Sequence, residues 1–181
     1  MNEDQLYRRY LSGDASAGDQ LMLRLGDALT AYLNAFLHHP QDAEDMMLDC
    51  FAAILVNKPA IGDGHFRAYL FKMARNKANR LWRLRLRRPS FSMDESLLPG
   101  NEAPDDALLK GEMRAALERC LNRIAPQYRE ALYLVYDLEM SYAQASQVMA
   151  CDTTRIENLL KKGKAQMRRE LEKEGITHAD L

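Results

Sequence analysis

The chain has 181 residues, of which 47% are hydrophobic and 28% charged, and its formal net charge is −1. This composition excludes an intrinsically disordered chain, and 9 glycines and 6 prolines are too few for the many turns of a β-sandwich or barrel. No apolar run approaches the roughly 18 residues that span a bilayer, and the acidic residues 1–4 are unlike a signal peptide. We therefore expect a cytoplasmic, all-α protein without membrane insertion.

The first half of the chain predicts three helices. Apolar residues recur at helical spacing over residues 16–37, and the His38-His39-Pro40-Gln41 string ends this pattern. Asp42 is a suitable N-cap for a second helix, which ends before Pro59. A glycine-containing loop at residues 60–64 then leads to a long helix over residues 66–87. The expected buried stripe of this long helix is Phe66, Tyr69, Leu70, Met73, Ala74, Leu81 and Leu84.

Charge is strongly polarised along this half of the chain. Residues 1–56 carry nine acids against Arg8, Arg9 and Arg24. Residues 65–88 contain no acid and nine bases: Arg67, Lys72, Arg75, Lys77, Arg80, Arg83, Arg85, Arg87 and Arg88. A merely solvated helix would mix charges of both signs, so this segment predicts binding to a polyanion. Phe71 and Trp82 fit the buried stripe least well and are candidates for stacking on unpaired bases.

The second half begins with a linker. Residues 89–104 contain Pro89, Pro99, Gly100 and Pro104 and show little periodicity. Helices are then predicted over residues 105–124, from Pro126, over residues 142–149 after the cap Ser141, and over residues 153–173 after the cap Asp152. We therefore expect two small helical domains, residues 1–88 and 105–181, joined by a flexible linker at 89–104.

The last two helices have the layout of a helix-turn-helix, with a tight turn at residues 150–152. Val148, Ile156, Leu159 and Leu160 would form the shared core. The N-terminal end of the second helix would enter the major groove, with lysines beside the DNA backbone. The candidate DNA-binding residues are Thr153, Thr154, Arg155, Glu157, Asn158, Lys161, Lys162 and Lys164. An ordinary helical hairpin with a solvated charged face is the plainer alternative.

Four segments, in order, resemble the extracytoplasmic-function group of bacterial RNA polymerase sigma factors. DAEDMMLDCF at residues 42–51 is similar to the acidic helix of region 2.2 in that family. FRAYLFKMARN at residues 66–76 is similar to the FRxWLxxIARN segment of regions 2.3 and 2.4. LNRIAPQYREAL at residues 121–132 is similar to the opening of region 4, and Ser141-Tyr142 matches the start of its helix-turn-helix.

The resemblance implies a sigma factor that directs promoter-specific initiation of transcription. The first domain would bind the clamp helices of the largest subunit of core RNA polymerase, and region 4 the flap of the second-largest. Implied polymerase contacts are Asp42, Glu44, Asp45, Asp49 and Phe51. The minus-ten element would be melted by the loop at residues 60–64 and by Arg67, Lys72, Arg75, Asn76, Asn79, Arg80 and Arg83. The last helix would read the minus-thirty-five element.

The family also implies an anti-sigma factor as a partner, and no cofactor, metal or small-molecule substrate. Tyr69 replaces the usual tryptophan of the family motif. Glu157 and Leu159 stand where lysine and arginine are common in the recognition helix. The loss of these two bases implies a less positive DNA-facing surface, and with it either an unusual promoter element or a chain far from the centre of the family.

Three other functions remain open from the residues. One of them, a purely protein-binding helical scaffold, would leave the acid-free composition of residues 66–88 unexplained. A helix-turn-helix regulator acting without polymerase would use the C-terminal domain in the same way, but it needs no second DNA-binding surface. An enzyme would need a constellation that the chain lacks, because there is no HExxH, no ExxH pair and no glycine-rich phosphate loop. Cys50, Cys120 and Cys151 form no metal or disulfide pattern, and we interpret them as small buried hydrophobic residues in a reducing compartment.

Overall fold

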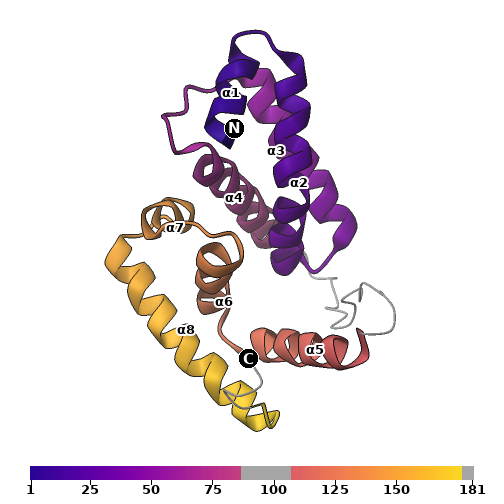
Figure 1. Cartoon of the computed structure of the whole chain (residues 1–181), viewed down its shortest axis with the longest axis vertical. Coiled ribbons are helices and arrows are strands. Elements are labelled where there is room, and N and C mark those ends of the chain that lie inside the picture. The colour runs from indigo at the N-terminus through magenta and orange to yellow at the C-terminus, as the bar shows by residue number, and fades with distance from the viewer. Residues whose placement is uncertain (87–106, 177–181) are drawn as a thin grey trace. The chain divides into compact units, whose positions relative to one another are not determined.

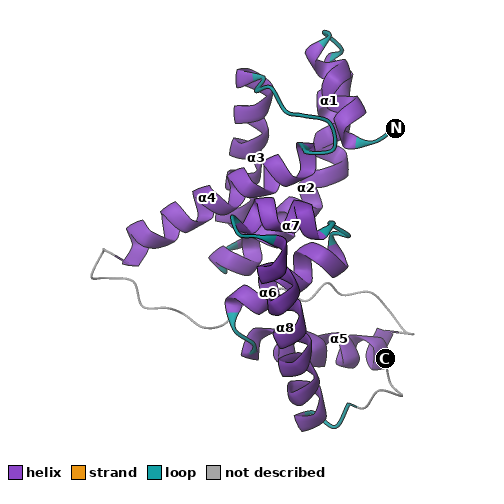
Figure 2. Ribbon diagram, turned by 90° about the vertical axis from the view of Figure 1, so that its left-hand side faces the viewer, coloured by secondary structure: helices purple, strands orange, loops and turns teal. Residues whose placement is uncertain are grey.

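The computed structural model describes residues 1–86 and 107–176, and within these two ranges every regular element is a helix (Figures 1 and 2). The all-α prediction is therefore confirmed. The elements are α1 (Glu3–Leu11), α2 (Ala15–Leu37), α3 (Pro40–Asn57), α4 (Phe66–Leu86), α5 (Ala107–Arg123), α6 (Pro126–Leu132), the π-helix η1 (Tyr133–Asp137), α7 (Tyr142–Met149) and α8 (Thr153–Lys173).

These helices form two compact units. The first contains α1 to α4, and the second is built mainly from α5, α6, α7 and α8. The predicted linker at residues 89–104, together with Arg87 and Arg88, lies outside the described residues. In the described part of the chain, no helix is both long and apolar enough to cross a membrane.

The helix α1 is absent from the sequence prediction. It begins with a capping box, because the Asn2 side chain accepts a hydrogen bond from the Gln5 amide and the Gln5 side chain accepts one from the Asn2 amide. Leu6 and Tyr7 are buried on its inner side. The capping pair followed by adjacent apolar residues is the signal that could have predicted this helix.

The core of the first unit lies between α2, α3 and α4. Leu21, Leu29 and Leu33 of α2 are completely buried, as the helical spacing predicts. At Gly18, an added Cβ atom would lie 3.1 Å from the ring of Tyr10 and 3.4 Å from Leu55, so α1 and α3 pack closely there. The ring of Tyr32 meets that of Phe71 edge-on, with centroids 5.3 Å apart, and this contact joins α2 to α4.

The start of α3 differs from the prediction. The helix begins at Pro40, and the N-cap is His39, whose Nδ1 accepts a hydrogen bond from the Asp42 amide at 3.3 Å. Proline suits the first helical position because its missing N–H has no partner there in any case. Asp42 therefore lies inside the first turn and is not the cap. His38 ends α2 in the left-handed conformation, with φ of 49°.

The buried stripe of α4 is also shifted from the prediction. Phe66, Leu70 and Ala74 are buried as expected, whereas Tyr69 is 37% exposed and Leu84 is 50% exposed. Ala68, Phe71 and Ala78 are buried in their place. Small alanines let α4 approach its neighbours, and the aromatic residue at position 69 lies outside that contact.

In the second unit, α8 packs closely against α6. A Cβ atom at Gly163 would lie 3.2 Å from both the Cβ of Tyr128 and the Cδ1 of Leu132, so the glycine leaves little room for a side chain between the two helices. Pro126 occupies the first turn of α6, as predicted.

Burial raises the pKa of the Tyr133 phenol to about 12 and, at the other end of η1, raises that of the Asp137 carboxyl.

Two of the three cysteines lie in the core. Cys50 and Cys120 are completely buried, and Cys151 is half-buried. Burial raises the pKa of the Cys50 thiol to about 11, so it stays protonated and unreactive at neutral pH. Among the described residues, no group of histidine, cysteine or acidic side chains could hold a metal ion.

Candidate protein- and nucleic-acid-binding surfaces

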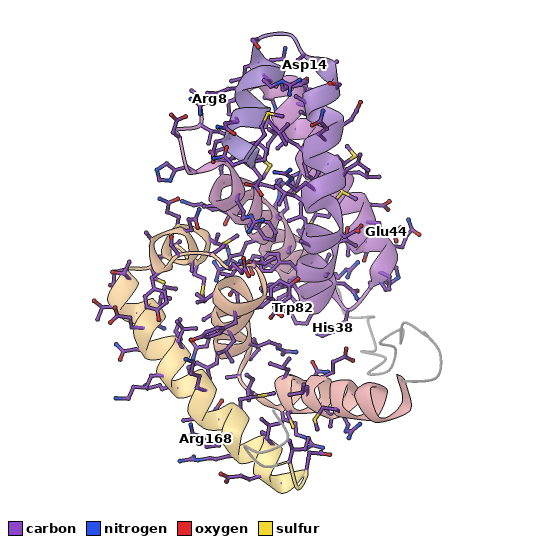
Figure 3. The ribbon with its side chains drawn as sticks, viewed as in Figure 1. Arg8, Asp14, His38, Glu44, Trp82 and Arg168 are labelled. Atoms are coloured by element: carbon purple, nitrogen blue, oxygen red, sulfur yellow. The ribbon has the colours of Figure 1, made fainter. Side chains whose placement is uncertain are left out.

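The outer face of α3 is acidic. Glu44, Asp45 and Asp49 are exposed on it, and Figure 3 shows Glu44 on the outer side of the helix. Leu48 lies between these acids and Val56 follows them near the end of the helix, and the two side chains are 50% and 79% exposed. An exposed face that combines carboxylates with aliphatic side chains suits a protein partner with a basic and partly apolar surface.

Two of the predicted polymerase contacts have other roles in the structure. Phe51 is completely buried, so its side chain belongs to the core and cannot reach a partner; that prediction is wrong for Phe51. The phenylalanine at the end of the segment 42–51 is therefore explained by its packing between α2, α3 and α4. Asp42 is half-buried and its carboxylate pairs with the guanidinium of Arg85 in α4.

The outer face of α4 is basic and polar. Exposed side chains follow each other at intervals of three or four residues, which places them on one side of a helix. They are Tyr69, Lys72, Asn76, Arg80 and Arg83. Arg75 and Asn79 are half-buried at the border of this face. Among described residues, Lys72, Arg80 and Arg83 have no ion pair, so their charges face solvent.

Other bases of α4 are neutralised by the neighbouring helices. Arg67 pairs with Glu3 of α1 at 3.1 Å, where the two side chains are 30% and 19% exposed. Lys77 lies 3.8 Å from Asp49 of α3. Arg67 was expected to bind DNA, but it lies opposite Lys72 and Asn76 on the helix and is engaged by α1. We therefore remove it from the candidate DNA-binding residues.

The aromatic residues of α4 divide into two groups. Phe66 and Phe71 are completely buried, so neither ring can stack on a base, and the expectation for Phe71 is wrong. Trp82 is 38% exposed and Tyr69 is 37% exposed. These two rings are the ones that α4 presents at the surface of the first unit.

The segment between α3 and α4 starts at Lys58, whose φ of 46° ends α3 in the left-handed conformation. Gly64, with φ of 79°, comes shortly before α4. The Tyr7 hydroxyl donates to the Pro59 carbonyl at 2.8 Å, and the Phe66 amide donates to Asp4 Oδ1 at 3.1 Å. The segment predicted to be a flexible loop is therefore attached to α1 at both ends.

The turn between α7 and α8 is tight. Ala150 has a φ of 54°, and the Cys151 amide donates to the Ser146 carbonyl at 3.0 Å, which is the hydrogen bond of a Schellman motif. The predicted caps are confirmed. Ser141 Oγ accepts from the Gln144 amide at 3.2 Å, and Asp152 Oδ1 accepts from the Arg155 amide at 2.7 Å.

The outer face of α8 carries the candidate recognition residues. Each of them is exposed: Thr153, Thr154, Arg155, Glu157, Asn158, Lys161, Lys162 and Lys164. The Lys164 ammonium lies 4.6 Å from the ring centroid of Tyr136 in η1. A hydrogen bond to Tyr136 raises the pKa of Lys164, so this lysine is held in its charged form beside the ring.

The inner face of α8 corrects one expectation. Ile156, Leu159 and Leu160 are buried, as predicted for the shared core of the helix-turn-helix. Leu159 is only 5% exposed, so a base at this position would not face DNA in this fold. Leu159 therefore removes no positive charge from the recognition surface. Of the two positions where the family commonly has a base, only Glu157 changes the surface that faces DNA.

At its far end, α8 is joined to α5 by ion pairs. Arg119 and Arg123 lie 3.1 Å and 2.7 Å from the carboxylate of Glu174. Hydrogen bonds from Arg119 and then Arg123 lower the pKa of Glu174. Figure 3 shows Arg168 on the outer side of α8. Glu170 and Glu174 thus serve the fold, while Arg168 remains on the outside.

Comparisons with known proteins match both units. A family model described as Sigma-70 region 2 matches residues 21–88, and one described as Sigma-70, region 4 matches residues 114–167. The chain is 28% identical over 160 residues to the RNA polymerase sigma-H factor of Pseudomonas aeruginosa, covering 82% of this chain and 83% of that protein.

Two solved structures have a similar fold. One is CnrH in complex with the cytosolic domain of CnrY, with 23% identity, a TM-score of 0.67 and coverage of 94% of this chain and 97% of that chain. The other is the sigma factor RpoE in complex with the anti-sigma factor NepR from Bartonella quintana. It has 20% identity, a TM-score of 0.67 and coverage of 85% of this chain and 96% of that chain.

Proposed function

Since this chain belongs to the sigma-70 family of RNA polymerase sigma factors, in the extracytoplasmic-function group, we propose that α3, α4 and α8 carry its contacts with polymerase and promoter. A sigma factor directs promoter-specific initiation of transcription and is not itself an enzyme. Residues 1–88 act as the region 2 domain and residues 105–181 as the region 4 domain, with residues 89–104 between them. The protein works in the cytoplasm, where it meets core polymerase.

The acidic face of α3 binds the clamp helices of the largest polymerase subunit. Glu44, Asp45 and Asp49 supply the charge, and the exposed Leu48 adds an apolar contact. Asp42 contributes less to this surface because its carboxylate is engaged by Arg85. Truncating a central charged residue of such an interface weakens binding mainly by leaving its partner unpaired.

The outer face of α4 and the segment at residues 58–65 engage the minus-ten element. Lys72, Arg80 and Arg83 neutralise phosphates, and Asn76 offers an amide to a base edge. The exposed ring of Tyr69 suits stacking on an unpaired base. Arg75 and Asn79 support this face from its border.

The N-terminal half of α8 reads the minus-thirty-five element in the major groove. Arg155 and Asn158 have the donors and acceptors that suit guanine and adenine edges, and Thr153 and Thr154 lie at the helix N-terminus, which favours a phosphate. Lys161, Lys162 and Lys164 lie along the DNA backbone. Region 4 also contacts the flap of the second-largest polymerase subunit.

One observation carries this assignment: neighbouring helices of one unit expose opposite charges, acidic on α3 and basic on α4. The test is to reconstitute holoenzyme from the full chain and core polymerase and to measure core affinity and promoter opening separately. Asp45→Lys with Asp49→Lys weakens core binding at least about tenfold, since removing charged interface partners costs roughly 2–5 kcal/mol. Asn76→Ala leaves core binding intact and impairs opening of a promoter fragment mapped with the wild-type chain.

Asp19→Lys is the matched control, because Asp19 is an exposed acid on α2 and lies outside the α3 surface. It keeps both activities. If Asp45 and Asp49 affected only opening and Asn76 only core affinity, the two surfaces would be assigned wrongly. Tight, sequence-specific binding of duplex DNA by the free chain would favour the regulator that acts without polymerase.

An anti-sigma factor is the further partner that we propose. Each of the two solved relatives is bound to another protein in its structure, NepR being an anti-sigma factor by name. In this chain, such a partner blocks the acidic face of α3. Charge reversal at Asp45 and Asp49 would then weaken capture of the anti-sigma factor and of core polymerase together.

A further inference from the structure

The helix α1 holds the beginning of the segment at residues 58–65. The hydroxyl of Tyr7 donates a hydrogen bond of 2.8 Å to the carbonyl oxygen of Pro59. Next to it, the ammonium of Lys58 lies 5.2 Å from the ring centroid of Tyr10. These contacts fix the direction in which the chain leaves α3.

The same helix holds the end of the segment. The amide of Phe66, the first residue of α4, has no carbonyl partner within its own helix. It donates instead to Asp4 Oδ1 at 3.1 Å, and Glu3 pairs with Arg67 at 3.1 Å. The rings of Tyr7 and Phe66 lie with their centroids 4.9 Å apart. One short helix therefore binds both ends of a segment that has no regular structure of its own.

The side chains of Tyr7 and Phe66 are buried, whereas the hydrogen bonds to Pro59 and Asp4 are partly buried. Tyr7 is 2% exposed and Phe66 is completely buried, so water cannot easily replace the bonds that hold the segment. Burial raises the pKa of Tyr7, which keeps its hydroxyl protonated as a donor. Arg8 and Asp63 add a pair at 3.3 Å, but both are well exposed and the pair contributes little.

We propose that α1 is a positioning element for minus-ten recognition, in which Tyr7 and Asp4 hold residues 58–65 in the conformation that receives an unpaired promoter base. This rests on the proposed function of that segment and of the α4 face. The matched region 2 model begins at residue 21, so α1 lies outside it. Tyr7 and Asp4 are positioning residues because they reach the DNA only through the segment that they hold.

The test uses holoenzyme assembled from core polymerase and full-length variants. Tyr7→Phe removes one hydroxyl and keeps the buried ring, and Asp4→Ala removes the acceptor for Phe66. Tyr10→Phe is the matched control: Tyr10 also donates a hydroxyl from α1 to a backbone carbonyl, at 2.9 Å, but its acceptor is Leu55 inside α3. Asp4→Asn retains an acceptor oxygen and is the conservative rescue.

Two readouts separate positioning from general stability. Hydrogen–deuterium exchange of the full chain reports whether residues 58–65 loosen while α2 and α3 stay protected. The second readout is binding of the single-stranded non-template minus-ten oligonucleotide, taken from a promoter mapped with the wild-type chain. For Tyr7→Phe and Asp4→Ala we expect faster exchange in the segment and about fivefold weaker oligonucleotide binding, the size of one lost hydrogen bond. Core affinity stays unchanged, and Tyr10→Phe and Asp4→Asn behave like the wild type.

Each other result overturns the inference. Unchanged exchange at residues 58–65 in both variants would mean that α1 does not hold the segment. Faster exchange with full oligonucleotide binding would mean that its position does not matter for recognition. An equal fall in core affinity would mean that α1 is merely structural. If the wild-type holoenzyme opened no promoter, the proposed function itself would fail, whatever the exchange of the variants.

Discussion

The helices α4 and α8 have the same length, 21 residues, and carry most of the candidate DNA contacts, yet they are stabilised in different ways. α4 contains no acid, and its neighbours supply the missing charge: Glu3 from α1 and Asp49 from α3. Its first amide is capped from another helix, by Asp4. α8 has a cap in its own sequence, Asp152. At its far end, it supplies acids to the arginines of α5.

The difference shows that the positive charge of a segment without acids can be neutralised by acids of the helices that pack beside it. Part of the charge of α4 is used to hold the first unit together, and only its outer face remains for DNA. The recognition end of α8 depends less on other helices, because its cap is local and its bases are all exposed. Variants that act on packing, caps and ion pairs test whether the two helices differ in this way.

The largest effect is expected from the side chains that dock α4. Phe71 is completely buried against Tyr32, so Phe71→Ala should lower the free energy of unfolding of the first unit by about 3–5 kcal/mol. The single tryptophan, Trp82, lies in α4 and reports unfolding of this unit by fluorescence during urea denaturation. Leu23→Ala is the control, since Leu23 is 82% exposed and should change little. A small effect of Phe71→Ala would contradict the packing of α4.

In α8, the corresponding docking contact is a glycine. Gly163→Leu should destabilise the second unit by about 1–3 kcal/mol, because its side chain would overlap Tyr128 and Leu132 of α6. Calorimetry of the full chain measures this loss. Gly26→Ala provides the contrast, since a Cβ atom there meets only Met47, at 3.8 Å, and alanine favours helix. If Gly163→Leu were as stable as the wild type, α8 would not rest on α6 by close backbone contact.

A smaller effect is expected at the cap of α8. Asp152→Ala should cost the second unit about 1 kcal/mol, because the Arg155 amide loses its acceptor. Asp152→Asn keeps an acceptor oxygen and should restore most of the stability. Hydrogen exchange in the first turn of α8 checks both variants. An effect that extended to α4 would show that the cap is not local.

The smallest effect concerns the ion pairs between α5 and α8. The pKa of Glu174 is lowered in the folded state, first by Arg119 and then by Arg123, so its contribution is present above the ordinary glutamate value of 4.5. The contribution is lost as the pH falls through the lowered pKa. Glu174→Gln should therefore lower Tm at pH 6, the difference from the wild type should shrink as the pH falls below 4.5, and salt should reduce it further.

The control for this prediction is Glu172→Gln. Glu172 is an exposed acid two residues away, and no ion pair joins it to a described residue. Its substitution should leave the pH dependence of Tm unchanged. Equal pH profiles for Glu174→Gln and the wild type would mean that Arg119 and Arg123 do not hold this carboxylate in solution.

Much of this fold follows from local sequence. The spacing of leucines predicts α2, and the caps Ser141 and Asp152 predict the starts of α7 and α8. The sequence predicts too late a start for α3, because Asp42 looks like a cap and the histidine that caps the helix is an uncommon choice. The bulged helix η1 has no sequence signature, and its wider turn was not predictable.

The candidate sites were predictable in part. The exposed acids of α3 and the outer residues of α4 and α8 lie at the surface, as a helical repeat requires. The errors at Phe51, Arg67 and Leu159 share one cause: a motif identifies a residue but does not say which side of the helix faces the core. For Arg67, the ion-pair partner Glu3 is also distant in sequence and belongs to α1, a helix that the apolar spacing does not predict.

The inward direction of Leu159 has a practical consequence for changing the promoter that this protein recognises. Ile156, Leu159, Leu160 and Gly163 form a fixed frame, whereas Thr154, Arg155, Glu157 and Asn158 can be exchanged without touching it. A library built to recognise synthetic promoters therefore gains nothing from diversity at position 159, because that side chain packs in the core and does not face DNA. The same frame allows the outward side chains of a related factor to be grafted as a cassette.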